Sequence, residues 1–257
     1  MNFKDIVITD GAVQKGDSMK VFISGVSSGL GLALAEDLIR RGNAVWGIGR
    51  RAVDTFRTET LSSGLFRYFE CDTTDGAQVK NVFNKMLEED FIPDTAVFCA
   101  GSATDDIVEK DFRGDKFREN FNVNLFGALC WVELLLPHFI KRNKGIFAGI
   151  SSMSIFRENH EKRIGYSASR VALNKTFENL RMQYINTALE FVIFNMGRMR
   201  EKRTLIGTSY AAAARFISED LRARKTGGTV NVPFSQYLLT RMTEFLPDKV
   251  YHNFFRR

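Results

Sequence analysis

The stretch "SGVSSGLG", residues 24–31, decides the fold. It follows the apolar run "KVFIS", which is typical of a buried strand, and it leads into "LALAEDLIRRGN", where apolar residues recur at helical spacing. Because glycine tolerates positive φ, the chain can turn tightly here and its backbone N–H groups can approach a phosphate closely. The stretch therefore predicts a strand, a glycine turn and a helix whose N-terminus can bind a phosphate group.

Strand-like and helix-like segments alternate along nearly the whole chain from Lys20 onward. Short apolar runs predict strands at 20–25, 44–50, 65–72, 95–101, 145–152, 189–197 and 228–233. Apolar residues at helical spacing predict helices at 29–43, 77–90, 114–141, 166–186 and 208–225. This alternation is typical of a parallel sheet with helices on both faces. We therefore expect an α/β fold with a single doubly wound parallel sheet, whose site lies beyond the carboxyl ends of the strands.

Length and composition fit one domain. The chain has 257 residues, 44% of them hydrophobic, and most of its 23 phenylalanines are expected in the core. We expect residues 1–18 to form an N-terminal extension with a short strand at 5–9. Residues 19–257 are expected to form the domain, including a helical tail at about 234–257. The net charge is +6, but no nucleic-acid-binding motif accompanies it, so a solvated basic surface is favoured over nucleic acid binding.

The cysteines Cys71, Cys99 and Cys130 are sparse and form no CxxC pair. No His/Cys cluster has the spacing of metal ligands, so we expect buried, inert thiols and no metal site. The N-terminus lacks the pattern of a secretory signal, and no stretch is expected to reach the apolar length of a membrane span. These features together predict a cytoplasmic protein.

Three further motifs fall at strand ends or on the helices that follow: "NVNLFG" with Asn124, "SS" at 151–152, and "YSASR" at 166–170. With the glycine turn, they follow the order and approximate spacing of the short-chain dehydrogenase/reductase family, which residues 20 to about 232 resemble. The resemblance implies a Rossmann-type fold, a nicotinamide cofactor, and reduction of a ketone or aldehyde or the reverse oxidation. It leaves the substrate open.

The resemblance also implies a set of cofactor-binding residues. They are Gly25, Ser27, Ser28, Gly29, Leu30 and Gly31 in the turn, Asp72 for the adenine ring, Ala100 and Gly101 after the fourth strand, and Arg50, Arg51, Tyr166 and Arg170. The second strand ends in "GIGRR", where an acidic residue would accept hydrogen bonds from the ribose hydroxyls of NAD. Because a guanidinium suits a 2′-phosphate, Arg50 and Arg51 predict NADP rather than NAD.

Tyr166 and Arg170 lie one helical turn apart, so both side chains can point into one site, where a cation favours the ionised form of a phenol. The resemblance implies that Tyr166 is the acid/base, that Ser152 donates a hydrogen bond to the carbonyl oxygen, and that Asn124 supports the site. Ser151 is the alternative to Ser152 if the strand register differs.

Arg170 stands where the family has lysine. Arginine keeps the positive charge but is effectively always protonated, so it cannot deliver a proton in its turn. Two outcomes are open. Arg170 can act as a fixed cation in a working enzyme, or the chain can be a catalytically impaired cofactor-binding protein that acts as a sensor or scaffold.

The segments expected to frame the substrate are 153–165 and 198–207, which are rich in basic residues: Arg157, Lys162, Arg163, Arg198, Arg200, Lys202 and Arg203. They suggest an anionic or sugar-type substrate, or simply face water. The apolar tail is expected to pack on the core or to cover the substrate, with peripheral membrane contact and a lipid substrate as the alternative. The family resemblance implies a homodimer formed through the helices at 114–141 and 166–186.

Overall fold

A computed structural model describes residues 18–52, 58, 60–157, 162–201, 207–223 and 227–255. The short strand expected at 5–9, and all of the N-terminal extension except Ser18, lie outside the described residues.

A seven-stranded sheet forms the centre of the molecule, with strand order β11-β8-β7-β4-β1-β2-β3. Every neighbouring pair in it is parallel. The strands are β1 Lys20–Ser24, β2 Ala44–Gly49, β3 Phe66–Glu70, β4 Thr95–Phe98, β7 Gly145–Ser152, β8 Leu189–Met196 and β11 Gly228–Val232. The predicted doubly wound parallel sheet is confirmed, and its order changes direction between β1 and β4, where such folds bind their ligands.

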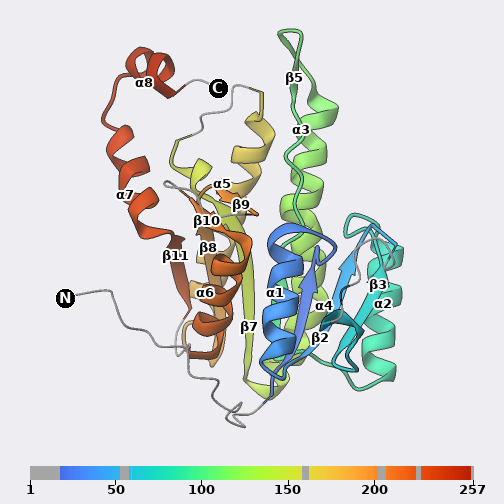
Figure 1. Ribbon diagram of the computed structural model, residues 1–257. Helices are drawn as coiled ribbons and strands as arrows, with labels where there is room; N and C mark the ends of the chain where they lie inside the picture. The colour runs from blue at the N-terminus through green and yellow to red at the C-terminus, as the bar shows by residue number, and fades with distance from the viewer. Residues whose placement is uncertain are drawn as a thin grey trace, which may run out of the picture.

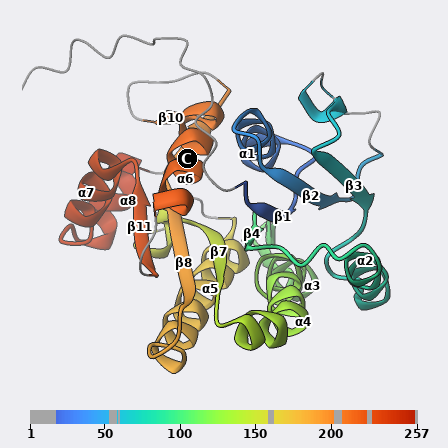
Figure 2. The same cartoon turned by 90° about the horizontal axis from the view of Figure 1, so that it is seen from below.

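Helices cover both faces of the sheet, as Figure 2 shows along the strands. The helices α1 Gly29–Arg40 and α6 Tyr210–Ala223 cover one face. The opposite face is covered by α2 Gly76–Glu88, by the continuous helix formed from α3 Gly114–Phe121, a π-helical turn Asn122–Phe126 and α4 Gly127–Arg142, and by α5 Ile164–Gln183.

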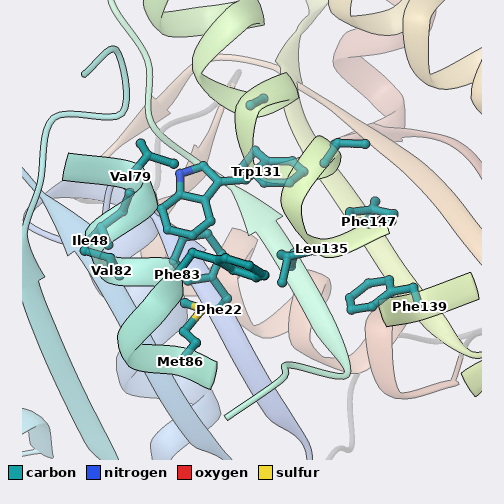
Figure 3. Packing of buried hydrophobic residues seen from close by; sticks show 14 of the residues in the cluster. Phe22, Ile48, Val79, Val82, Phe83, Met86, Trp131, Leu135, Phe139 and Phe147 are labelled. Atoms are coloured by element: carbon teal, nitrogen blue, oxygen red, sulfur yellow. The ribbon is translucent and has the colours of Figure 1, made fainter. Parts of the chain in front are cut away.

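The core beneath α2 and α4 is rich in aromatic side chains (Figure 3). Phe22 of β1 packs on Trp131 of α4 with ring centroids 4.2 Å apart, and Phe147 of β7 stacks between neighbouring rings. Among the described residues, however, several phenylalanines are exposed: Phe112, Phe126, Phe216, Phe234, Phe245 and Phe254. The expectation that most phenylalanines lie in the core therefore does not extend to these six rings.

Several shorter elements lie outside the sheet. They are the hairpin β5 Ile107–Val108 and β6 Asp111–Phe112, the 3-10 turns Thr60–Ser62 and Met153–Ile155, the pair β9 Met199–Arg200 and β10 Thr208–Ser209, and the helices α7 Phe234–Thr243 and α8 Asp248–Phe255. In Figure 1 the hairpin and α3 rise above the sheet on one side, and α7 and α8 rise on the other. We call residues 234–255 the C-terminal arm.

The continuous helix Gly114–Arg142 corrects one expectation. Among the described residues it is the one helix long and apolar enough to cross a membrane, with 44% of its apolar window buried inside the molecule. The reason is that between Asn122 and Ile140 only Glu133 is charged. Buried core helices have the same composition, and Trp131, Leu135 and Phe139 of this helix pack on the sheet.

Candidate active site

The glycine turn between β1 and α1 brings backbone atoms into close contact. Gly25 and Gly29 have φ of +81° and +57°, which L side chains rarely adopt. A Cβ on Gly25 would lie 2.6 Å from the backbone nitrogen of Ala100, and one on Gly31 would overlap the carbonyl oxygen of Gly25. The turn is therefore a shallow backbone cradle that any larger residue would fill, and it opens at the N-terminus of a twelve-residue helix.

A cleft of about 720 Å³ extends from this turn along the carboxyl edge of the sheet. Every residue predicted to bind the cofactor lines it: Gly25, Ser27, Ser28, Gly29, Leu30, Gly31, Arg50, Arg51, Asp72, Ala100, Gly101, Tyr166 and Arg170. The sequence motifs, which come from five separate strand ends, thus meet in one cavity.

The end of the cleft beside β2 is shaped by Gly49. A Cβ at this position would lie 3.0 Å from both the Ser27 Oγ and the Tyr68 hydroxyl, so a larger residue here would require these two side chains to shift by a few tenths of an ångström. The Tyr68 hydroxyl donates to the carbonyl oxygen of Arg51, and burial and the charge of Glu70 raise the pKa of Tyr68 to about 12. The exposed side chains of Arg50 and Arg51 stand beside this end of the cleft.

Asp72 is held in place by its neighbours. Its backbone N–H donates to Gln78 Oε1 at 2.9 Å, and its Oδ1 accepts from the backbone N–H and the hydroxyl of Thr74. These bonds orient the Asp72 carboxylate at the wall of the cleft, where it can accept a hydrogen bond from an amino group such as that of adenine.

Tyr166 and Arg170 stand together at the opposite end, on the first turns of α5. The Arg170 Cζ lies 5.4 Å from the centroid of the Tyr166 ring, and Arg170 is only 6% exposed. Its Nη1 donates to the carbonyl oxygen of Ile150 at 2.8 Å, while a Cβ on Gly101 would overlap its Nη2.

The charge of Arg170 has no carboxylate beside it within the described part of the chain, and its buried Nε has no acceptor there. A buried, uncompensated cation is costly unless an anion or a set of oxygens completes it. Its place at the end of the cleft therefore suits a ligand that brings oxygen atoms, such as a ribose.

Asn124 lies at the π-helical turn between α3 and α4 and is buried. Its Oδ1 accepts from the backbone N–H of Ser102 at 2.8 Å, and its Nδ2 donates to the carbonyl oxygen of Ser102 and to Ser169 Oγ. Asn124 thus ties the segment after Gly101 to α5 and does not line the cleft. The structure gives it a positioning role for the helix that carries Tyr166.

The two serines at the end of β7 differ in their surroundings. Ser151 lines the cleft, but its Oγ is buried, accepts from Asn174 Nδ2 at 2.6 Å and donates to the carbonyl oxygen of Arg170. Ser152 is outside the lining; its Oγ accepts from the backbone N–H of Ser154 at 3.1 Å and, within the described residues, donates to nothing. Ser152 therefore keeps a hydrogen to donate, whereas Ser151 has used its own.

Two thiols line the cleft, Cys71 and Cys99. Burial raises the pKa of each to about 12, with the carboxylates of Asp72 and Asp75 adding to the effect at Cys71 and Arg170 opposing it at Cys99. The three cysteines are unpaired, and no cluster of metal ligands occurs among the described residues.

The cleft also contains residues that sequence reasoning missed: Ile48, Thr73, Ser102, Ala103, Val123, Ile150, Met199 and Tyr210. Most are small or apolar and fill spaces between the motifs. Tyr210 is different, because it comes from the first turn of α6 and reaches the glycine turn. No motif signals it, since it follows a short segment without periodicity.

The substrate side changes the expectation for two of the basic residues. Arg157 Nη1 donates to the carbonyl oxygens of Thr243 and Leu246, and its Nη2 pairs with Asp248 at 2.8 Å. Arg163 Nε pairs with Asp105 at 2.9 Å. The guanidinium of Arg157 is thus engaged within the chain and is not free for an anionic substrate, whereas Arg163 is engaged through its Nε in a partly exposed ion pair. Lys202 and Arg203 lie outside the described residues.

Comparisons with known proteins agree with this geometry. The family model described as short chain dehydrogenase matches residues 19–204. The chain belongs to this family. It is 26% identical over 246 residues to an uncharacterized oxidoreductase of Myxococcus xanthus, covering 91% of this chain and 95% of that protein.

A second relative, a fatty acyl-CoA reductase of Acinetobacter baylyi, is 30% identical over 156 residues, which cover 59% of this chain and about half, 52%, of that protein. Among solved structures, a serine dehydrogenase in its closed form with NADP+ superimposes with a TM-score of 0.74 at 17% identity, covering 84% of this chain and 95% of that one. A Leptospira borgpetersenii short chain dehydrogenase with NAD+ does so with 0.75 at 16% identity, covering 92% and 100%. At these identities the structures show a shared fold.

A nicotinamide dinucleotide fits the residues present. The turn offers backbone N–H groups where any Cβ would intrude, Asp72 and the basic pair flank one end, and the orphaned Nε of Arg170 lies at the other. The family membership and this donor set make the chain a nucleotide-binding oxidoreductase of the short-chain dehydrogenase family.

Proposed function

We propose that this short-chain dehydrogenase uses NADP(H) to reduce a ketone or aldehyde, or to oxidise the corresponding alcohol. The observation that carries the proposal is the pair Tyr166 and Arg170 at one end of a cleft, at whose other end β2 is followed by arginines rather than by an acidic residue. The phenol supplies the proton chemistry, and the buried guanidinium supplies a fixed positive charge beside it.

The preference for NADP rests on the residues around Gly49. In an NAD-binding site, an acidic side chain at the end of the second strand accepts hydrogen bonds from the ribose hydroxyls. Here β2 ends in Gly49, which has no side chain and lies close to the hydroxyls of Ser27 and Tyr68, and the exposed Arg50 and Arg51 follow directly. Two guanidiniums and a serine hydroxyl are the donors that a doubly charged 2′-phosphate favours.

When bound, the nicotinamide ring supplies or accepts the hydride. In the reduction, Ser152 donates its free hydrogen to the substrate carbonyl oxygen, and Tyr166 transfers its hydroxyl proton to that oxygen as negative charge develops on it. Arg170 then faces the resulting phenolate and stabilises it. Because Arg170 stays protonated, the proton that restores Tyr166 must come from solvent rather than from this side chain.

Activity tests this proposal directly. Purified protein is expected to consume NADPH with some members of a panel of aldehydes and ketones, and Tyr166→Phe is expected to lower the turnover at least a hundredfold. Tyr184→Phe, in a tyrosine at the C-terminal end of α5 whose ring stacks on Phe191 outside the cleft, serves as the matched control and should leave turnover unchanged. Equal turnover in the wild type and Tyr166→Phe would contradict the assignment.

A second candidate is a cofactor-binding protein without turnover, acting as a sensor or scaffold. It is favoured by one contact: the Arg170 Nη1 already donates to the Ile150 carbonyl oxygen, which draws part of the guanidinium away from the site. Arg170→Lys separates the candidates. If the lysine variant turns over carbonyls that the wild type only binds beside NADPH, the second candidate holds; if it is slower than the wild type, Arg170 is suited to this site.

We also propose a homodimer in the cytoplasm. The helices α4 and α5 expose apolar side chains on their outer surface, among them Ile140, Val171 and Met182 at 47%, 47% and 52% exposure. Such a surface is typical of a subunit contact. The unpaired cysteines suit a reducing compartment. Light scattering after gel filtration tests the dimer, and a monomer at micromolar concentration would overturn it.

A further inference from the structure

Tyr210 is the first residue of α6, and its ring lies against the glycine turn. The ring carbon Cζ lies 3.6 Å, and the hydroxyl oxygen 3.9 Å, from the position that a Cβ on Gly29 would occupy. Both distances are ordinary contact distances, so the ring covers the side of the turn at which Gly29 has no side chain. Tyr210 also lines the cleft.

The backbone of Tyr210 is well fixed. Helix α6 packs along α1, as both views in Figures 1 and 2 show, through the buried residues Ala213, Ala214 and Ile217. Ser209 Oγ accepts from the backbone N–H of Ala212 at 3.1 Å and so caps the start of α6. The position of the ring at the N-terminus of α1 therefore follows from helix packing rather than from a mobile loop.

The hydroxyl of Tyr210 makes no hydrogen bond to any residue in the described part of the chain. Its ring is nevertheless partly buried against the core. Packing alone would be served equally well by phenylalanine. A phenol that is held with its hydroxyl beside a phosphate-binding turn has a donor to offer to an anion.

We propose that Tyr210 is a further cofactor-binding residue, whose hydroxyl donates a hydrogen bond to the diphosphate of the dinucleotide held by the glycine turn. The opposite end of the turn is already occupied by a cation, since Arg51 Nη1 lies 3.5 Å from the carbonyl oxygen of Ser27. The diphosphate is thus bound between the backbone N–H groups of the turn, the positive end of the α1 dipole and a phenol from α6. This inference rests on the proposed use of NADP(H).

The consequence is a link between the two halves of the sheet. Helix α6 follows β10 and, before it, the segment 198–207 that is expected to frame the substrate, whereas α1 belongs to the cofactor side. A hydrogen bond from Tyr210 to the cofactor would hold the start of α6 against the occupied cleft. Bound cofactor would then add one more contact to the start of α6, which helix packing and the Ser209 cap already fix.

The experiment compares Tyr210→Phe with the wild type by isothermal titration calorimetry, using NADPH, 2′-phospho-ADP-ribose and, by competition with NADPH, 2′-AMP. The first two ligands carry the diphosphate and the third lacks it. We expect the variant to bind the first two about tenfold more weakly, which is the loss typical of one hydrogen bond to a charged group, and to bind 2′-AMP as the wild type does.

Tyr237→Phe is the matched control, because it removes a tyrosine hydroxyl outside the cleft and should change no affinity. Unchanged binding of NADPH by Tyr210→Phe would show that the ring only packs, and would overturn the inference while leaving the proposed function intact. An equal loss for all three ligands would also overturn it, since the effect would not reside in the diphosphate. If the wild type binds none of the three ligands, the proposed function fails together with this inference.

Discussion

The glycine turn and the C-terminal arm lie at the same edge of the sheet, yet they are held in opposite ways. The turn is fixed by close backbone contacts that leave no space for a side chain at Gly25 or Gly31. The arm is exposed, with Phe245 and Phe254 at 89% and 80%, and the side chain of Arg157 binds it through two carbonyl oxygens and one carboxylate.

Arg157 itself is well buried, with its side chain 13% exposed, and its Cζ lies 4.0 Å from the centroid of the Tyr251 ring. Arg157 lies just after the 3-10 turn Met153–Ile155, which follows the end of β7 at Ser152. The two regions are therefore sensitive to different changes. Added side-chain volume should disrupt the glycine turn, whereas loss of the Arg157 guanidinium should loosen the C-terminal arm.

The largest effect is expected from Gly31→Ala. The added Cβ overlaps the carbonyl oxygen of Gly25, so the turn must shift, and overpacking of this kind costs about 1–3 kcal/mol. We expect NADPH binding to be lost and the melting temperature to fall. Gly228→Ala is the matched control, because no atom lies within 4 Å of its added Cβ. If Gly31→Ala binds NADPH with wild-type affinity, the turn does not depend on the absence of a side chain at this position.

The next effect is expected from Arg157→Ala, which removes the donors to Thr243, Leu246 and Asp248. Leaving buried carbonyl oxygens without partners should lower the free energy of unfolding by about 2 kcal/mol and speed proteolysis within the arm, with NADPH affinity unchanged. Arg163→Ala, which breaks an exposed ion pair with Asp105, should cost less than about 1 kcal/mol. If protease cleaves the arm of Arg157→Ala no faster than that of the wild type, Arg157 does not hold the arm in place.

A smaller effect concerns the thiols of the cofactor side. The pKa of Cys71 and of Cys99 is raised to about 12 by burial, so both remain protonated at pH 8 and should react slowly with iodoacetamide until the protein is unfolded. The folded state binds these protons more tightly than the unfolded state, whose thiols ionise near pH 9. Their contribution to stability is therefore present below pH 9 and is lost as the pH rises towards 12. Rapid labelling of the folded protein at either position would contradict this.

The smallest effect is expected from Phe245→Ser. Because the ring is 89% exposed, the change should alter the free energy of unfolding by less than about 0.5 kcal/mol. Any marked change in light scattering with this variant would instead show that the arm contacts another surface in solution. A drop in melting temperature of several degrees would mean that the ring is covered in the folded protein.

The sequence was sufficient to predict the seven strands of the sheet and their parallel arrangement, and every residue predicted to bind the cofactor lines the cleft. These features depend on local signals: apolar runs of strand length, and glycines at positions where a side chain cannot fit. The helix carrying Tyr166 begins at Ile164 rather than at 166, and the predicted helix at 208–225 begins at Tyr210, because β10 takes up Thr208 and Ser209.

Other features could not be predicted because they depend on contacts between distant segments. Tyr210 meets Gly29 across two packed helices, and Arg157 meets residues almost ninety positions away. The π-helical turn at Asn124 likewise depends on bonds to Ser102 and Ser169. A basic residue such as Arg157 has the same local signature whether it binds a substrate or the chain itself, so only the structure separates the two.

The central claim is that this cleft binds a dinucleotide and that Arg50 and Arg51 select the one with a 2′-phosphate. The most direct test is a calorimetric titration of the wild type and the Arg50→Ala/Arg51→Ala variant with NADPH and NADH. We expect the wild type to bind NADPH at least tenfold more tightly than NADH. The variant should lose that preference, while its affinity for NADH stays unchanged. Equal affinities for the two dinucleotides in the wild type, or tighter binding of NADH, would contradict it.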